Sequence, residues 1–136
     1  MTLVELLVVC IFIGTLAAIA LPSFLSQTSK GKDADAISNA RNLAATVEVC
    51  NVTEDGYATA ACEQPANSGI PVDPYGTSVP AAGHAAVASA GPGGYTIVSS
   101  SRSGELFKIV RDPVSGVLTR SCSTPGTGSC PKSGAW

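Results

Sequence analysis

Four cysteines in the polar part of the chain offer the clearest chemistry in this sequence. They are Cys50, Cys62, Cys122 and Cys130, while Cys10 lies in an apolar run. An even number of cysteines in a short polar segment is typical of disulfides formed in an oxidising compartment. Zinc binding is the competing interpretation, but the spacings are long and no CxxC pair occurs. We therefore expect two disulfides. The local pairs, Cys50 with Cys62 and Cys122 with Cys130, are favoured among three possible pairings because they need the least chain rearrangement.

The other polar side chains do not suggest catalysis. His84, the single histidine, stands in an Ala/Gly-rich stretch and is expected to be an exposed loop residue. Asp73 and Asp112 do not make a dense acidic loop of the calcium-binding type. The glycines around Pro92 precede an expected strand, whereas a phosphate-binding loop precedes a helix. We expect no enzyme activity, no catalytic residue, no metal or other cofactor and no small-molecule substrate.

Charge and aromatic content argue against nucleic acid as a partner. The formal net charge is −2, which encodes no general attraction to nucleic acid or to anionic lipid. The aromatic residues are few and scattered, so they give no support for a platform on which bases could stack.

Glu5 is the most informative charged residue, because it stands at the start of an apolar run. From Leu6 to Leu21 the sequence carries no charge. Counted from the first residue, the run gives about 21 residues, or about 30 Å of helix, which is enough to cross a bilayer. A cleavable secretory signal begins with positive charges, but here Lys30 is the first basic residue. A plain membrane anchor explains the length of the run but not the glutamate.

Two interpretations of Glu5 remain open on the residues alone. Burying a carboxylate costs a few kcal/mol unless a partner pairs with it. The α-amino group of Met1 is the nearest cation, but in one straight helix it lies about one turn away and points along the axis. The amine of a neighbouring copy could reach Glu5 if helices packed with an axial stagger, and the pair would then set the register between subunits. Alternatively, Glu5 is a first-turn acid stabilised by the helix dipole.

The first nine residues, MTLVELLVV, resemble the mature N-terminus of type IV pilins and pseudopilins. Thr2, Glu5, Gly14 and Pro22 also stand where this family has them. The resemblance is specific but covers only about the first 25 positions, and the remaining chain is similar in layout alone. It implies that a prepilin peptidase removes a short basic leader and that the new first residue, here Met1, is N-methylated. Because no leader precedes Met1 in this sequence, we expect the mature form.

The resemblance implies a structural subunit of a type IV pilus, or fimbrium, used for adhesion, motility or DNA uptake. Such a subunit waits in the inner or cytoplasmic membrane as a single-pass protein. Assembly machinery with its own ATPase then packs identical copies, through their N-terminal helices, into an extracellular helical filament. A minor pilin or a type II secretion pseudopilin is the alternative within the family. A membrane-anchored adhesin or binding module that never polymerises is the alternative from another class.

Gly14 and Pro22 are expected to weaken the N-terminal helix. Glycine costs roughly 1 kcal/mol of helix propensity relative to alanine, and proline lacks an N–H and crowds the preceding turn. One interpretation is a kink in an intact helix. The other, implied by the resemblance, is a loss of helix between these residues inside an assembled filament.

After Pro22 the chain predicts an amphipathic helix whose apolar stripe needs a sheet to cover it. The residues on this stripe are Ala36, Ile37, Ala40, Leu43, Ala44, Val47 and Cys50. Largely off it lie Lys32, Asp33, Asp35, Ser38, Asn39, Arg41, Asn42 and Glu48. Alternating or β-rich runs at 95–99, 105–111 and 117–122 predict three strands of an antiparallel meander, with Phe107 and Ile109 in its core.

The sequence therefore predicts an α+β, pilin-like fold in which a long N-terminal helix packs on a small antiparallel β-meander. Residues 1–25 form the transmembrane and filament-core helix, and residues 26–136 form the head. The predicted parts of the head are the amphipathic helix 26–51, a disulfide loop and variable region 52–94, the sheet 95–122 and a disulfide-bonded tail 123–136.

Overall fold

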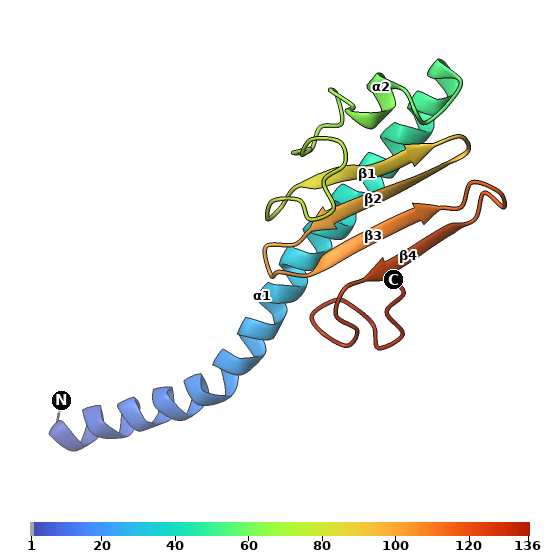
Figure 1. Cartoon of the computed structure of the whole chain (residues 1–136). Helices are drawn as coiled ribbons and strands as arrows, with labels where there is room; N and C mark the ends of the chain where they lie inside the picture. The colour runs from blue at the N-terminus through green and yellow to red at the C-terminus, as the bar shows by residue number, and fades with distance from the viewer. Residues whose placement is uncertain (1) are drawn as a thin grey trace.

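A computed structural model describes residues 2–136 and has the predicted α+β arrangement, consistent with a pilin-like fold. Its four-stranded antiparallel sheet, in the order β1-β2-β3-β4, lies against the C-terminal half of a long helix (Figure 1). The elements are α1 (Leu3–Glu54), α2 (Ala60–Glu63), β1 (Ala85–Gly91), β2 (Gly94–Ser100), β3 (Leu106–Arg111) and β4 (Leu118–Cys122).

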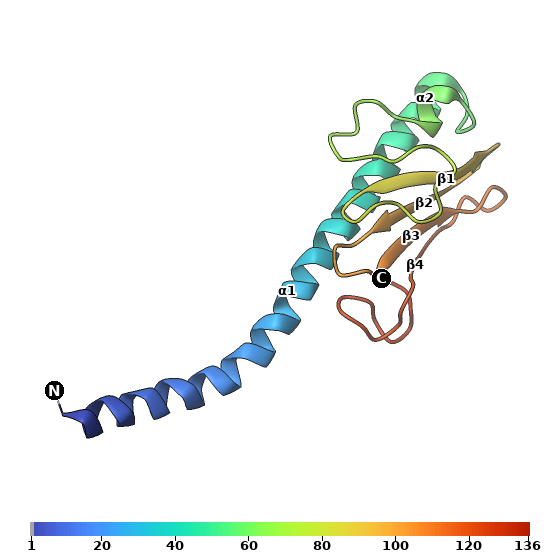
Figure 2. The same cartoon turned by 60° about the vertical axis from the view of Figure 1, so that its left-hand side comes forward.

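Helix α1 is continuous through both Gly14 and Pro22. Figures 1 and 2 show that it bends between its free N-terminal stretch and the part that carries the sheet. Pro22 lies inside the helix and supplies a cause, since it cannot donate to the carbonyl of Ala18 and its ring crowds that carbonyl. The single chain thus has an intact helix with a bend. Loss of helix inside a filament stays a prediction.

The predicted stripe of α1 forms one side of the core. Ala36, Ala40, Leu43 and Val47 are almost completely buried, whereas Ile37 and Cys50 at the margin of the stripe are only half-buried. The sheet covers the stripe with side chains from its strands, among them Tyr95, Ile97, Phe107 and Ile109. The predicted core positions Phe107 and Ile109 are confirmed.

Strand β1 corrects the sequence analysis, which placed its residues in the variable region 52–94. The sheet spans 85–122 and not 95–122. The sequence AAVASAG of β1 has few β-branched or aromatic residues, so its intrinsic preference for a strand is weak. It is a strand because a tight turn at Pro92 and Gly93 pairs it with β2, beginning at Gly91 and Gly94. Gly93 has φ 81°, which glycine adopts without strain.

Both disulfides have the local pairing that the sequence favoured. Cys50 is bonded to Cys62, which ties the end of α1 to α2. Cys122 is bonded to Cys130, which ties the C-terminal loop to β4. Cys10 is an exposed free thiol.

Replacing Leu43 with Ala should lower the free energy of unfolding by about 2–5 kcal/mol, because it leaves a cavity between α1 and the sheet. Urea unfolding of the full chain in detergent micelles would measure the change. The exposed neighbour Asn42 is the control, and Asn42→Ala should stay within about 0.5 kcal/mol of the unaltered chain. Equal effects of the two changes would contradict the assignment of the core.

Candidate assembly surface

The first half of α1 presents apolar side chains all around its circumference. Every residue from 2 to 28 is exposed, so the head covers none of this surface. Within the part of the chain that the structure describes, α1 is the one helix long and apolar enough to cross a membrane. An exposed apolar surface of this extent marks a site for lipid or for another protein.

Glu5 forms a capping box with Thr2 at the start of α1. The N–H of Glu5 donates to Thr2 Oγ1 (3.3 Å), and the N–H of Thr2 donates to Glu5 Oε2 (3.4 Å). This arrangement gives Glu5 the local first-turn role that was one of its two interpretations. Pairing between copies is not tested by one chain. Met1, with its predicted roles in assembly, processing and N-methylation, lies outside the described residues.

Neither Gly14 nor Gly31 is required by packing within the chain, because a Cβ atom at either position would meet nothing within 4 Å apart from its chain neighbours and the adjacent backbone of the helix. Gly14 therefore lies in the free half of the helix with open space around it. The hydroxyl of Thr15 donates to the carbonyl of Phe12 (2.9 Å). This polar group is thus already satisfied inside the helix, as a surface that enters lipid or a helix bundle requires.

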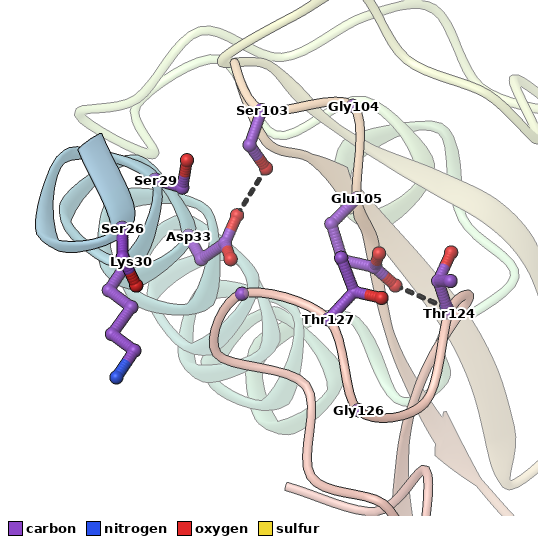
Figure 3. Close-up of a pocket in the computed structure, with 11 residues that line it drawn as sticks. Ser26, Ser29, Lys30, Asp33, Ser103, Gly104, Glu105, Thr124, Gly126 and Thr127 are labelled. Carbon is purple, nitrogen blue, oxygen red and sulfur yellow. Dashed lines mark hydrogen bonds between the residues drawn. The ribbon is translucent and has the colours of Figure 1, made fainter. Parts of the chain in front are cut away.

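Asp33 joins α1 to two other segments of the head, and its position corrects the sequence analysis, which placed it off the buried stripe. Its side chain is fully buried. The hydroxyls of Ser101 (2.7 Å) and Ser103 and the N–H of Ser129 (2.9 Å) donate to its carboxylate. Figure 3 shows the contact with Ser103. Position 33 continues the stripe one turn before Ala36, and the three donors offset the cost of burying the charge.

Glu48 is the second contact between α1 and the sheet that sequence reasoning missed. It accepts hydrogen bonds from Tyr57 Oη (2.7 Å), Tyr95 Oη (2.9 Å) and Arg111 Nη1 (2.8 Å). Burial and the hydrogen bond to Glu48 raise the pKa of Tyr57 to about 12. The same two causes raise the pKa of Tyr95. Both phenols are therefore held neutral, as donors to one carboxylate.

The C-terminal residues are anchored by polar and aromatic contacts. Glu105 accepts hydrogen bonds from Ser123 Oγ (2.7 Å) and from the N–H of Thr124 (2.5 Å). The ring of Trp136 packs edge-on against Phe107, with 5.7 Å between centroids, and its Nε1 donates to the carbonyl of Ser121 (2.8 Å). Together with the Cys122–Cys130 disulfide, these contacts make the tail a fixed part of the head.

A polar cavity of about 610 Å³ lies where the free half of α1 meets the head (Figure 3). Asp33 and Glu105 are on its walls, but both carboxylates are already held by donors from the chain. The residues that line it are Ser26, Ser29, Lys30, Asp33, Ser103, Gly104, Glu105, Thr124, Gly126, Thr127 and Gly128.

Two other groups of side chains could in principle hold a metal ion or a proton, and both are occupied by structural contacts. Glu105, Cys122 and Cys130 lie close enough to share a metal ion, but the two sulfurs form a disulfide and offer no thiolate. His84 Nδ1 lies 2.7 Å from Asp73 Oδ1, so His84 is a partly exposed loop residue with a partner. The N–H of Ala81 also donates to Asp73, and this contact and His84 lower the pKa of its carboxyl.

Comparison of the chain with models of known protein families, with curated proteins and with solved structures finds no match.

Replacing Asp33 with Ala should lower the free energy of unfolding by about 2–4 kcal/mol, because two hydroxyls and one N–H lose their acceptor. Chemical unfolding in micelles would measure this loss. Asp35 is an exposed acid on the same helix, and Asp35→Ala serves as the matched control with an expected change below about 0.5 kcal/mol. A loss of stability no larger than that of the control would contradict the anchoring role.

The raised tyrosine pKa values predict a loss of stability at alkaline pH. The pKa of Tyr57 in the folded chain is about 12, above the ordinary value of about 10. Its contribution is therefore fully present below about pH 10 and is lost as the pH rises through the folded value. The thermal midpoint of unfolding should therefore decrease as the pH is raised from about 10 to about 12. In the Tyr57→Phe/Tyr95→Phe variant the fall should be smaller, although the variant is less stable at pH 8. Parallel pH profiles would contradict this assignment.

Proposed function

We propose that this chain is a structural subunit of an extracellular helical filament of the type IV pilus kind. The observation that carries the proposal is the free half of α1, which is apolar, exposed over residues 2–28 and uncovered by the head. At about 25 cal/mol per Å² this surface is too costly to leave in water. It lies in the inner or cytoplasmic membrane before assembly and among the same helices of other copies afterwards.

The shape of the chain supports exchange of lipid for copies of itself. Head contacts begin near Ser29, which is the first half-buried residue of α1. The preceding stretch projects away from the head as a bare rod (Figure 2). Such a rod can lie beside others without steric conflict between the heads, provided that the heads surround the bundle. The filament then has a core of apolar helices and an outer layer of sheets and loops.

Glu5 supports a filament over a plain anchor. A capping box requires an acid or amide in the first turn. The helix dipole favours a charge there by only about 0.3–1 kcal/mol, which is less than the few kcal/mol that an unpaired carboxylate costs when it is buried. In the proposed filament, the carboxylate of one copy pairs with the α-amino group of Met1 in a neighbour and sets the axial stagger. Removal of a leader by a prepilin peptidase exposes this amine, and the assembly machinery supplies the energy for extraction.

The head supports an extracellular location for the finished filament. Two disulfides in a chain of this size are typical of proteins that mature in an oxidising compartment. The sheet and the anchored tail give the head a covalently reinforced surface. Adhesion, motility and DNA uptake are the roles that such a filament serves.

Electron microscopy of fibres sheared from the source cells, with mass spectrometry of their N-terminal peptide, tests the proposal. We expect this chain to be the main component of the fibres and its first residue to carry a methyl group. Recovery only in trace amounts would favour the minor pilin or pseudopilin. A stable monomer in water, with the first two dozen residues clipped off, would overturn the proposal.

Replacing Glu5 with Ala should leave the chain in the membrane and its head folded, yet reduce fibre yield by about tenfold or more. The α-amino group of the neighbouring copy then has no carboxylate to pair with, and a cost of about 1.4 kcal/mol per contact corresponds to a tenfold loss. Sheared fibre protein and membrane-bound protein would be quantified by immunoblot. The control is Asp35→Ala, which removes the same charge from an exposed position on the same helix. Unchanged fibre yield from Glu5→Ala would refute the pairing. Fibre loss from both variants would point to net charge instead.

A further inference from the structure

Strand β4 extends the sheet beyond the part that α1 covers. The strands in contact with α1 are β1, β2 and β3, and β4 forms the edge of the sheet beside β3 (Figure 1). Arg120 of β4 is paired with Ile109 of β3. Because directly paired residues lie on the same face of a sheet, Arg120 and Leu118 are on the side of α1, yet both are exposed. A groove of about 300 Å³ therefore remains between α1 and β4.

This arginine groove has one wall from α1 and one from β4. On α1, positions 41, 44, 45 and 48 recur at helical spacing, so their side chains share one face of the helix. The groove combines apolar side chains with a guanidinium group on each wall. The residues that line it are Arg41, Ala44, Ala45, Glu48, Tyr95, Ile109, Leu118 and Arg120.

The two guanidinium groups are brought together on one indole ring. The Cζ atoms of Arg41 and Arg120 lie 5.3 and 5.6 Å from the centroid of the Trp136 ring. Neither arginine belongs to either ion pair of residues 2–136. Stacking on Trp136 restrains both side chains, and two cations held near each other favour an anion between them. A guanidinium binds a carboxylate through two parallel hydrogen bonds, so a carboxylate suits this place.

The composition of the groove favours a protein as the source of the carboxylate. Arginine, tryptophan and tyrosine are the residues on which the binding energy of protein interfaces is concentrated. Here Arg41, Arg120 and Trp136 lie together, with Tyr95 on the wall of the groove. The apolar side chains between the arginines and Tyr95 can exclude water from an ion pair, which strengthens it.

The acids of the same chain are concentrated at the distal end of the head. Residues 42–101 contain five acids and no Lys or Arg, whereas residues 102–136 contain five Lys or Arg and two acids. Within the first segment, Glu48 and Asp73 are held by Arg111 and His84. The remaining three acids are Glu54, Asp55 and Glu63, which we call the acidic tip. The two segments are complementary in charge.

The acidic tip is presented on a rigid support. The Cys50–Cys62 disulfide joins the end of α1 to α2, and α2 lies beside that end (Figure 2). Glu54 and Asp55 are exposed at the C-terminus of α1, whose last turn holds no basic residue. Because the negative end of the helix dipole disfavours acids, a cation from another molecule stabilises this end of the helix.

We propose that the acidic tip of one copy docks in the arginine groove of a second copy. The inference rests on the proposed function and adds a contact between heads to the packing of the apolar rods. All copies in a helical filament point the same way, so the second copy is displaced along the axis. Arg41 and Glu54 are 13 positions apart on α1, which corresponds to a displacement of about 20 Å at 1.5 Å per residue. Contacts between different surfaces extend into open helical assemblies.

Charge reversal on each side of the contact tests it in fibres of the full chain. The groove variant, Arg41→Glu/Arg120→Glu, should lower the yield of sheared fibres by about tenfold or more, because acids then face the acidic tip. The tip variant, Glu54→Arg/Glu63→Arg, should lower the yield by a similar factor without altering the groove. Asp55 is left unchanged, since its φ of 55° is tolerated better by Asp than by Arg.

A chain that combines the two variants should recover the fibre yield of the unaltered chain, because the charges of tip and groove are then exchanged. The matched control is Arg102→Glu/Lys108→Glu, which changes the net charge as the groove variant does, at two exposed residues outside the groove. Its fibre yield should equal that of the unaltered chain. Circular dichroism of each variant in micelles checks that the head is folded.

Recovery of fibres by the combined chain, with a normal control, would support the contact. A folded groove variant or a tip variant that assembles normally, or a folded combined chain that stays defective, would overturn the contact while the proposed function stands. If the groove variant does not fold, the tip variant decides alone: a normal yield overturns the contact and a tenfold loss supports it. Failure of the unaltered chain to form fibres would instead refute the proposed function.

Discussion

The rest of this structure depends on one imbalance: the head covers only the C-terminal half of α1. The covered half buries its apolar stripe against the four strands, from Ala36 to Val47. The other half has apolar side chains on every side and no cover at all. Because exposed apolar surface is unfavourable in water, the chain is incomplete by itself. It needs apolar neighbours. In the proposed function, a bilayer provides them before assembly and the helices of other copies provide them in the filament.

A protruding rod of this kind makes the attachment of the head important. Asp33 holds the base of the head through serines from two segments, and Glu48 holds the upper part through two tyrosines and Arg111. Both acids are on α1, and they lie on either side of the apolar stripe's centre along the chain. These charge-assisted bonds are directional, so they fix how the sheet is oriented on the helix, which apolar contacts alone specify less strictly.

Exposed charges of α1 include residues at both ends of the head. Lys30 marks the base, while Glu54 and Asp55 mark the distal end, where the helix dipole makes acids unfavourable. The acids of α1 thus fall into two groups: Asp33 and Glu48 bind the head to its own helix, and the exposed acids face solvent.

The sequence by itself determined the long helix, its uncovered apolar half, three of the four strands and the disulfide pairing. These features follow from local patterns: an uninterrupted apolar run, helical and alternating periodicity, and cysteines near each other in the chain. Strand β1 was missed because its small residues have little preference of their own, and only pairing with β2 makes them a strand. Asp33 and Glu48 were placed outside the core because a charge is normally solvated. Only the tertiary structure brings serines and tyrosines from distant segments close enough to offset the cost of removing these carboxylates from water.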